Sequence, residues 1–416
     1  MNLKRMLSSL LLLAAPLALA APRPVPARLQ APAAGDLTPR ALVAVEAAFA
    51  SRADVPREAV TFTQALRADQ ALAAPQPFVA QSREWFVEAD AAALRAGVSV
   101  FTTRPEALVR LNAAPRELRD GRGRELALDP QRLIVRREGV EHGAGSGMSL
   151  LVDPEQLAAA GAPFVEGTTA FRFKPELGAG RFEIAAPDLR DDGRWVIHVF
   201  EPRSDAALTL GTGRADYLHG ETLRVEAELL GRGAAVERAQ AFVVAPGGRT
   251  FPLALARDGA RLRGDLVLDA LRSPGEGLWE VHVRVAGQSE GARVERVART
   301  AFSCSLPTAR LTGDATVTQG EAGVRVALGV EVAAPGRYDV RGVVYGRDAT
   351  GQARPLALAQ SAAWLDAGRG ELALDVDAGL IAKSGLAAPF ELRDVRLMDQ
   401  GRMGLLQRQE VALTLP

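Results

Sequence analysis

The chain is poor in the residues that build disulfide bonds and metal sites. It has one cysteine, Cys304, and four histidines among 416 residues. A single cysteine excludes an internal disulfide bond, so every domain must be held together by packing alone. No two histidines show the spacing of a zinc site. The sequence therefore predicts no metal ligand and no cofactor, and it carries no motif that assigns a catalytic residue.

Lysine is also scarce, and the charge is balanced. Three of the 50 basic residues are lysine and the others are arginine, set against 50 acidic residues. The arginines are scattered along the chain, whereas nucleic acids and anionic membranes are bound by a concentrated positive field. Neither is expected as a partner.

Long hydrophobic runs are absent after the first twenty residues. The run Met6–Leu19 follows Lys4 and Arg5 and ends in the small-residue pattern Ala18-Leu19-Ala20. These are the three parts of a secretion signal, and the run is shorter than the ~20 apolar residues that a membrane helix needs. We expect cleavage after Ala20, export of the mature chain, and no membrane span after cleavage.

A short phrase occurs three times in the rest of the chain. A glycine, one spacer and a large aromatic residue precede alternating apolar and polar residues at 193–199, 277–283 and 336–343. Such alternation is typical of a strand with one buried face, and it places Trp279 in a core. The copies begin 84 and 59 residues apart, which fits strands of successive β-sandwich modules better than short repeats.

The predicted fold class is all-β, with tandem immunoglobulin-like β-sandwiches after a mixed, mostly β N-terminal module. Short apolar runs between turn signals such as Asp258-Gly259 support this class. The predicted divisions are a signal peptide at 1–20, a linker rich in proline and alanine at 21–37, the N-terminal module at 38–203, and sandwiches at 204–305 and 306–416.

The N-terminal part carries two further local predictions. Its linker is expected to be an extended, mobile tether because of its proline content. A short helix is expected next, capped by Thr38 and with Leu42, Val45 and Phe49 on one face. At Asp191–Trp195 the aromatic residue follows a tight turn, as in the tyrosine corner of immunoglobulin-like domains, but tryptophan lacks the hydroxyl that ties that corner to the backbone.

The richest candidate for chemistry is the glycine-dense loop Glu141–Ser149, which contains His142 and Ser146. A nucleophilic serine needs a base, and a glycine loop can offer backbone amides to an oxyanion. The nucleophile elbow has glycine two residues on either side of its serine, whereas Ser146 has Ala144 and Met148 there. Two interpretations stay open: a mobile surface loop, or a hydrolytic site.

Two other groups have both a structural and a chemical interpretation. Cys304 shares a strand face with Phe302 and Leu306, which predicts a small buried side chain rather than a reactive thiol. The stretch Asp375–Gly379 begins like a calcium loop but lacks the third oxygen ligand and the closing glutamate. A strand-end turn is predicted there.

Four phrases carry a resemblance to a known family: Asp216–Glu221, Gly277–Val281, Ser361–Leu365 and Asp394–Met403. With them the chain resembles a bacterial secreted family of unknown function, built from an N-terminal β-rich module and two C-terminal immunoglobulin-like domains. The second module is also similar to macroglobulin-type sandwiches of envelope proteins. The resemblance implies architecture and location, and it brings no catalytic residues.

Three functions are consistent with these observations. The first is an exported, non-enzymatic β-sandwich protein that binds a protein or glycan partner in the periplasm or outside the cell. The alternative is a hydrolase or enzyme accessory whose N-terminal module works around His142 and Ser146. A chaperone-like accessory that adds an extended peptide to an open sheet edge is a third possibility. Convergence of His142, Ser146 and a carboxylate in a cleft would favour the enzyme.

Overall fold

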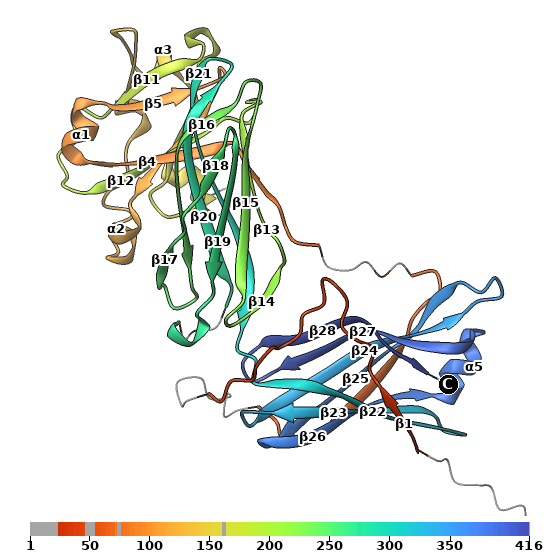
Figure 1. Cartoon of the computed structure of the whole chain (residues 1–416). Coiled ribbons are helices and arrows are strands. Elements are labelled where there is room, and N and C mark those ends of the chain that lie inside the picture. The colour runs from red at the N-terminus through yellow and green to blue at the C-terminus, as the bar shows by residue number, and fades with distance from the viewer. Residues whose placement is uncertain are drawn as a thin grey trace, which may run out of the picture.

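The computed structural model describes residues 24–45, 55–70, 72, 76–159, 164–273, 275 and 277–415. These residues form three modules, each made of two packed β-sheets around its own core. In Figure 1 the first module lies beside the upper half of the middle module, and the third lies at the other end of the middle one. The all-β prediction is confirmed, whereas the immunoglobulin-like assignment stays a prediction. The predicted signal peptide, 1–20, lies outside the described residues.

The first module consists of a five-stranded and a four-stranded sheet. The five-stranded sheet has the order β4 (Glu84–Asp90), β12 (Arg194–Phe200), β6 (Leu108–Ala113), β10 (Thr169–Phe173) and β9 (Met148–Val152). The other has the order β5 (Val98–Thr102), β11 (Gly180–Ala185), β7 (Ile134–Arg137) and β8 (Val140–His142). Short helices connect them: α1 (Ala91–Ala96), α2 (Pro115–Arg119), η2 (Pro130–Arg132), α3 (Ala144–Gly147), α4 (Pro154–Ala159) and η3 (Pro175–Leu177).

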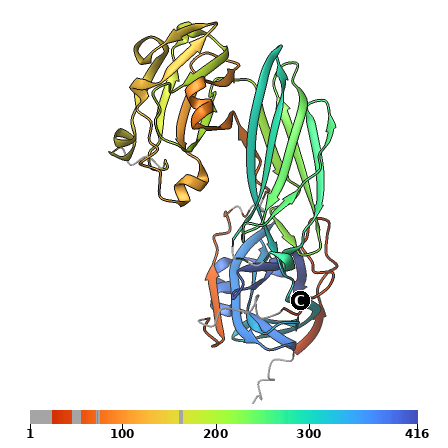
Figure 2. The same cartoon turned by 90° about the vertical axis from the view of Figure 1, so that its left-hand side faces the viewer.

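The middle module packs two five-stranded sheets together, and in Figure 2 it stands beside the first module and above the third. One sheet has the order β18 (Ala256–Asp258), β19 (Arg261–Val267), β15 (Thr222–Leu230), β13 (Ala207–Thr212) and β3 (Ala80–Ser82). The other has the order β14 (Asp216–Leu218), β21 (Ala292–Ser305), β20 (Trp279–Ser289), β16 (Ala235–Val244) and β17 (Thr250–Pro252). One turn, η4 (Ala270–Arg272), precedes β20.

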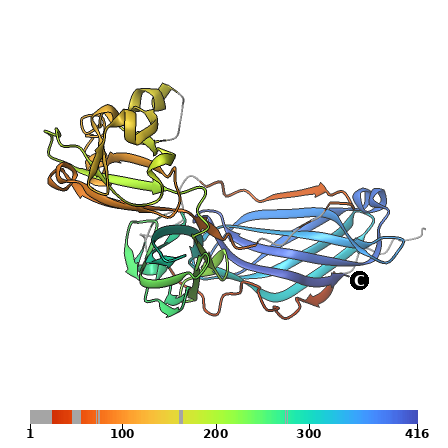
Figure 3. The same ribbon diagram turned by 90° about the horizontal axis from the view of Figure 1, so that it is seen from above.

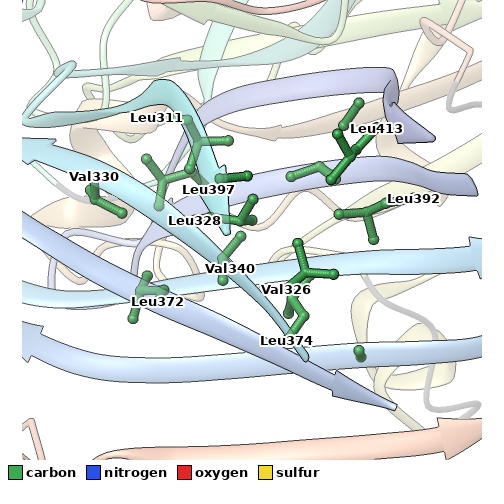
Figure 4. Close-up of a cluster of buried hydrophobic side chains, with 14 of the residues drawn as sticks. Leu311, Val326, Leu328, Val330, Val340, Leu372, Leu374, Leu392, Leu397 and Leu413 are labelled. Atoms are coloured by element: carbon green, nitrogen blue, oxygen red, sulfur yellow. The ribbon is translucent and has the colours of Figure 1, made fainter. Parts of the chain in front are cut away.

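The third module has its own hydrophobic core, which Figure 4 shows between its two sheets. The first sheet has the order β1 (Pro24–Arg28), β22 (Ala309–Gly320), β23 (Gly323–Val332) and β26 (Gly368–Asp377). The second has the order β2 (Val60–Ala65), β25 (Ala353–Leu365), β24 (Gly336–Arg347), β27 (Ala387–Asp399) and β28 (Gly404–Leu415). A helix, α5 (Ala378–Ser384), links β26 to β27.

The repeated phrase marks one central strand in each module. Its aromatic residues Trp195, Trp279 and Tyr338 are all buried, on β12, β20 and β24 respectively. The Tyr338 hydroxyl donates to Ala334 O at 2.5 Å, which is the backbone tie of a tyrosine corner. Trp195 has no hydroxyl, but its Nε1 makes a comparable bond to the backbone by donating to Leu126 O at 2.8 Å. The side chain of each copy is therefore anchored in its own module's core.

The N-terminal segment is built into the third module rather than hanging from the chain as a tether. Strand β1 pairs with β22 along its whole length. The chain then follows β28, where Leu37 and Arg408 exchange backbone hydrogen bonds of 3.0 and 2.9 Å. Strand β2 pairs with β25 on the opposite side of the module, as Figure 3 shows. We call residues 24–45 and 55–66 the N-terminal strap.

Three predictions about this region are thereby corrected. The linker at 21–37 contains strand β1, because an edge strand tolerates proline where its nitrogen atoms face away from the sheet. Residues 38–45 form no helix, and the remainder of the predicted helix lies outside the described residues. The N-terminal module begins near Glu84 instead of residue 38, since β2 belongs to the third module and β3 to the middle one.

Deleting residues 24–37 from the mature chain should loosen the third module while leaving the first module unchanged. The deletion removes the partner of β22 and the backbone bonds to β28, and each lost hydrogen bond is worth about 0.5–1.5 kcal/mol. Hydrogen exchange followed by mass spectrometry should show faster exchange in β22 and β28. Exchange in β5 and β11 is the internal control, and a peptide of residues 24–37 should restore protection. Unchanged exchange in β22 would contradict the strap.

A buried ion pair joins the first module to the middle one. Arg296 on β21 and Glu201 after β12 are 0% and 1% exposed, and Arg296 Nη1 lies 2.7 Å from Glu201 Oε2. The guanidinium also donates to Ala206 O at 2.9 Å and to Ser204 Oγ at 2.9 Å. Glu201 Oε1 accepts from the backbone N of Thr103 at 2.5 Å. The pair is surrounded by fixed hydrogen-bond partners from both modules.

Removing one partner of this buried pair should lower the free energy of unfolding far more than removing one partner of an exposed pair. Arg296→Met leaves the Glu201 carboxylate buried without its counter-charge, and such changes cost about 3–5 kcal/mol. Urea unfolding should show this loss, and Glu201→Gln in the same chain should recover part of it. The matched control is Arg263→Met, which removes an exposed partner of Glu226 and should cost about 0–1 kcal/mol. Equal losses in the two single variants would contradict the burial argument.

Candidate functional site

The predicted histidine and serine pair does not form a catalytic arrangement. His142 ends β8, and Ser146 lies on the exposed side of the short helix α3. Ser146 Oγ donates to Gly143 O at 3.4 Å, within its own turn, rather than to His142. Glu141 is engaged by Arg136, whose Nε donates to Glu141 Oε1 at 2.8 Å. Within the part of the chain that the structure describes, Ser146 Oγ thus has no hydrogen bond to His142 or to a carboxylate, and the surface-loop interpretation accounts for its contacts.

Two of the other histidines, His219 and His282, have local partners in separate places. His219 Nδ1 accepts from the backbone N of Ala270 at 3.2 Å. His282 Nε2 lies 2.9 Å from Glu280 Oε2. Among the residues that the structure describes, no group of three or more His, Cys, Asp or Glu side chains is arranged to hold a metal ion.

Two further predicted groups have structural roles. Asp377 caps α5, its Oδ1 accepting from Gly379 N at 2.7 Å and Leu380 N at 3.3 Å, so the calcium-like stretch is the start of a helix. Cys304 packs against the core of the middle module, and burial raises the pKa of its thiol to about 12. A thiol with so high a pKa stays protonated and unreactive at neutral pH.

The most distinctive surface is a row of rings and cationic side chains that crosses from the middle module to the first. It begins with Phe242 on β16, stacked on His282 of β20 with ring centres 4.9 Å apart and planes within 6°. Arg284, two residues further along β20, lies over Phe86 of β4 at 5.6 Å. The two modules therefore meet through an arginine and an aromatic ring.

The row continues across the five-stranded sheet of the first module. Phe86 lies 5.6 Å from His198, its neighbour on β12. His198 is paired in register with Arg110 on β6, and Arg110 lies over Phe164 at 5.1 Å. We call these seven residues the ring–cation row: Phe242, His282, Arg284, Phe86, His198, Arg110 and Phe164.

The row is accessible at its two ends and carries little free charge. Phe242 is 40% exposed and Phe164 is 42% exposed, whereas the five residues between them are half-buried. Arg284 pairs with Glu295 at 2.9 Å, and Arg110 lies 3.7 Å from Glu84. His198 is neutral at pH 7, because burial and then the charge of Arg110 lower its pKa to about 4. The surface offers flat apolar rings beside hydrogen-bond donors rather than a charged patch.

Only part of this row could be predicted from the sequence. In β20, His282 lies on the face opposite to the buried residues, as strand alternation predicts. Alternation does not predict the contact of Arg284 with Phe86, because that contact depends on how the first and middle modules are joined. The outward positions of β4, β12 and β20, each rich in aromatic or charged residues, were the available signal.

The family comparisons agree with the architecture. Residues 51–201 match the N-terminal domain, and residues 308–416 the C-terminal domain, of a family described as a domain of unknown function, DUF4785. The chain belongs to the DUF4785 family. No curated protein shows significant similarity to it.

One of two similar solved structures shares the fold of this chain. The crystal structure of a DUF4785 family protein from Legionella pneumophila is 20% identical, with a TM-score of 0.69, and the match covers 91% of this chain and 99% of that one. A putative membrane anchored protein from Corynebacterium diphtheriae is 9% identical, covers 86% of this chain and 89% of its own, and has a TM-score of 0.18, too low to indicate a shared fold. In the described part of this DUF4785 chain, no helix is both long and apolar enough to cross a bilayer.

The neutral His198 should make the protein less stable in mild acid. Its pKa is lowered to about 4 in the folded chain, against about 6.5 when unfolded, so the unfolded state binds the proton first as the pH falls. This histidine alone should remove up to ~3 kcal/mol of stability between pH 7 and pH 4. Urea unfolding at both pH values should show a smaller fall in His198→Gln. The fall should be unchanged in the control His142→Gln, and an equal fall in all three proteins would contradict the assignment.

Proposed function

We propose that this DUF4785 protein is an exported, non-enzymatic binding protein, and that its ring–cation row binds a neutral glycan. The row itself carries this proposal. A pyranose ring has an apolar face of C–H groups and a rim of hydroxyls. Flat rings such as Phe242 and Phe164 suit the apolar face, and the neighbouring guanidinium and imidazole groups can donate to the hydroxyls.

Two further observations support a neutral ligand and binding without chemistry. The cations of the row already have carboxylate partners, so an acidic glycan would find little unpaired positive charge. The predicted histidine and serine loop lacks a base for Ser146, which removes the observation on which the hydrolase alternative depended. Export is proposed from the predicted signal at residues 1–20, with the periplasm or the cell exterior as the place of action.

One observation favours a protein partner as a second candidate. Strand β2 lies at the edge of its sheet, and its Val60 and Phe62 side chains are 53% and 51% exposed. An exposed apolar edge strand is a template for adding a further strand. A protein partner would therefore bind the third module, far from the ring–cation row.

A glycan array with purified mature chain tests the first candidate. Neutral oligosaccharides should be retained and their acidic counterparts should bind no better. In titration calorimetry with the best ligand, Phe242→Ala and His282→Ala should each weaken binding about tenfold, since a stacked ring contributes about 0.5–1.5 kcal/mol beyond its buried area.

The matched control is Phe62→Ala, which removes another exposed ring, on the third module. It should leave glycan affinity unchanged. Absence of any bound glycan would overturn the proposal. Capture of extended peptides that depends on Phe62 would instead support the protein partner.

A further inference from the structure

A cavity of about 600 Å³ lies where the middle and third modules meet. The middle module contributes the loop after η4, the start of β20 and the end of β21, and the third contributes the β27–β28 hairpin. Trp279 and Leu278 lie on one side, and Met403 and Leu406 on the other. Ligand pockets typically have volumes of about 300–1,000 Å³ and lie at domain interfaces. This cavity has the size and the position of such a pocket.

The two sides of the cavity are held at a fixed distance. Thr308, in the short connection between the modules, donates from Oγ1 to Asp399 Oδ2 at 2.8 Å. Gly404 of the hairpin packs directly on Ser305, because a Cβ at Gly404 would lie only 3.0 Å from Ser305 Oγ. The hairpin is thus attached to the end of β21. The cavity is consequently preformed, which lowers the cost of binding.

Its lining presents no free charge. Among the described lining residues only Asp399 and Arg402 are charged, and they form a pair at 2.6 Å. Arg402 Nη2 also donates to Pro335 O at 3.3 Å. The Cys304 thiol, which lines the cavity too, is neutral. An ion that entered would lose water without gaining a counter-charge, which is strongly unfavourable.

One polar group in the lining lacks a hydrogen-bond partner. Ser273 is 5% exposed, and its Oγ makes no hydrogen bond within the described residues. An unpaired buried hydroxyl costs about 1–3 kcal/mol, and in native proteins such a group usually has a specific reason. Ser273 lines the same cavity as Trp279. The residue that bears the unpaired hydroxyl therefore borders the same cavity as the apolar wall, although the oxygen atom itself is buried.

We infer that this cavity binds a neutral small molecule with an apolar body and one hydrogen-bonding group. The body packs on Trp279, Leu278 and Met403, and the polar group pairs with Ser273 Oγ. The site is separate from the ring–cation row, which lies at the other junction of the middle module. We therefore expect its occupancy not to depend on glycan binding.

Fluorine NMR on the mature chain tests this inference with two matched probes. The first is a fluorinated hydroxybiphenyl, which is neutral, and the second is the fluorinated biphenyl carboxylate of the same shape. The neutral probe should broaden on addition of protein, and the carboxylate should bind at least tenfold more weakly. Ser273→Ala should weaken binding of the neutral probe about 3- to 10-fold, as expected for one lost hydrogen bond.

Three variants make the result specific. Leu278→Ser changes an exposed side chain at the rim, which leaves folding intact, and it should also weaken the neutral probe. Ser146→Ala makes the same serine change in the first module and should have no effect. His282→Ala, which tests the glycan row, should have none either. No broadening by wild-type protein, equal binding of the carboxylate, or equal losses in Ser273→Ala and Ser146→Ala would each overturn the inference.

Discussion

The pairing of the N-terminal strap with the third module is the constraint on which the overall shape depends. Strand β1 completes one sheet of that module and β2 completes the other, so both sheets end in strands from the opposite end of the chain. Backbone groups at a sheet edge must find partners or water. The third module therefore closes only after the chain has passed through the other two modules.

The alternation of side chains along each strand places one set of residues in a core and the other set on a surface that can contact another module. Inward positions of β20 build the core of the middle module, while its outward residue Arg284 reaches the ring of Phe86. The alternation fails where a second layer covers the outward face. In β24 the outward residues Arg337 and Asp339 are buried as well, and Arg337 Nη1 donates to Pro56 O at 2.7 Å in the strap. Outward-facing polar residues that would otherwise contact water thus form polar contacts where another segment covers them.

The strands of the cores were predictable from the sequence because alternation is a local signal. Trp279 and Tyr338 stand at positions where a large ring begins an alternating run, and both are buried. Strand β1 could not be predicted because Pro24 and Pro26 are typical of linkers. The two prolines lie two residues apart, so the nitrogen atoms of both can face away from β22. Strand β2 alternates visibly, but alternation does not identify the partner strand, and β25 lies almost three hundred residues away in sequence.

The candidate sites were harder to predict because each is assembled from more than one module. Phe86 and Arg284 belong to different modules, and so do Trp279 and Met403. Their separations depend on the angle at a junction, which no periodicity encodes. Polar contacts lie at both junctions: Arg296 and Glu201 are fully buried at the first, and Asp399 accepts from Thr308 at the start of the third module.

Buried ion pairs add little net stability compared with apolar packing, because removing both charges from water is costly. Their directional bonds nevertheless favour one arrangement over its neighbours. Arg296 contacts Glu201, Ser204 and Ala206 at once, and a rotation of the first module would break several of these contacts together. A surface that spans two modules keeps its shape only if their junction is rigid. The polar junction is therefore what makes the ring–cation row a single preformed surface, and it lowers the ordering cost of binding any ligand along it.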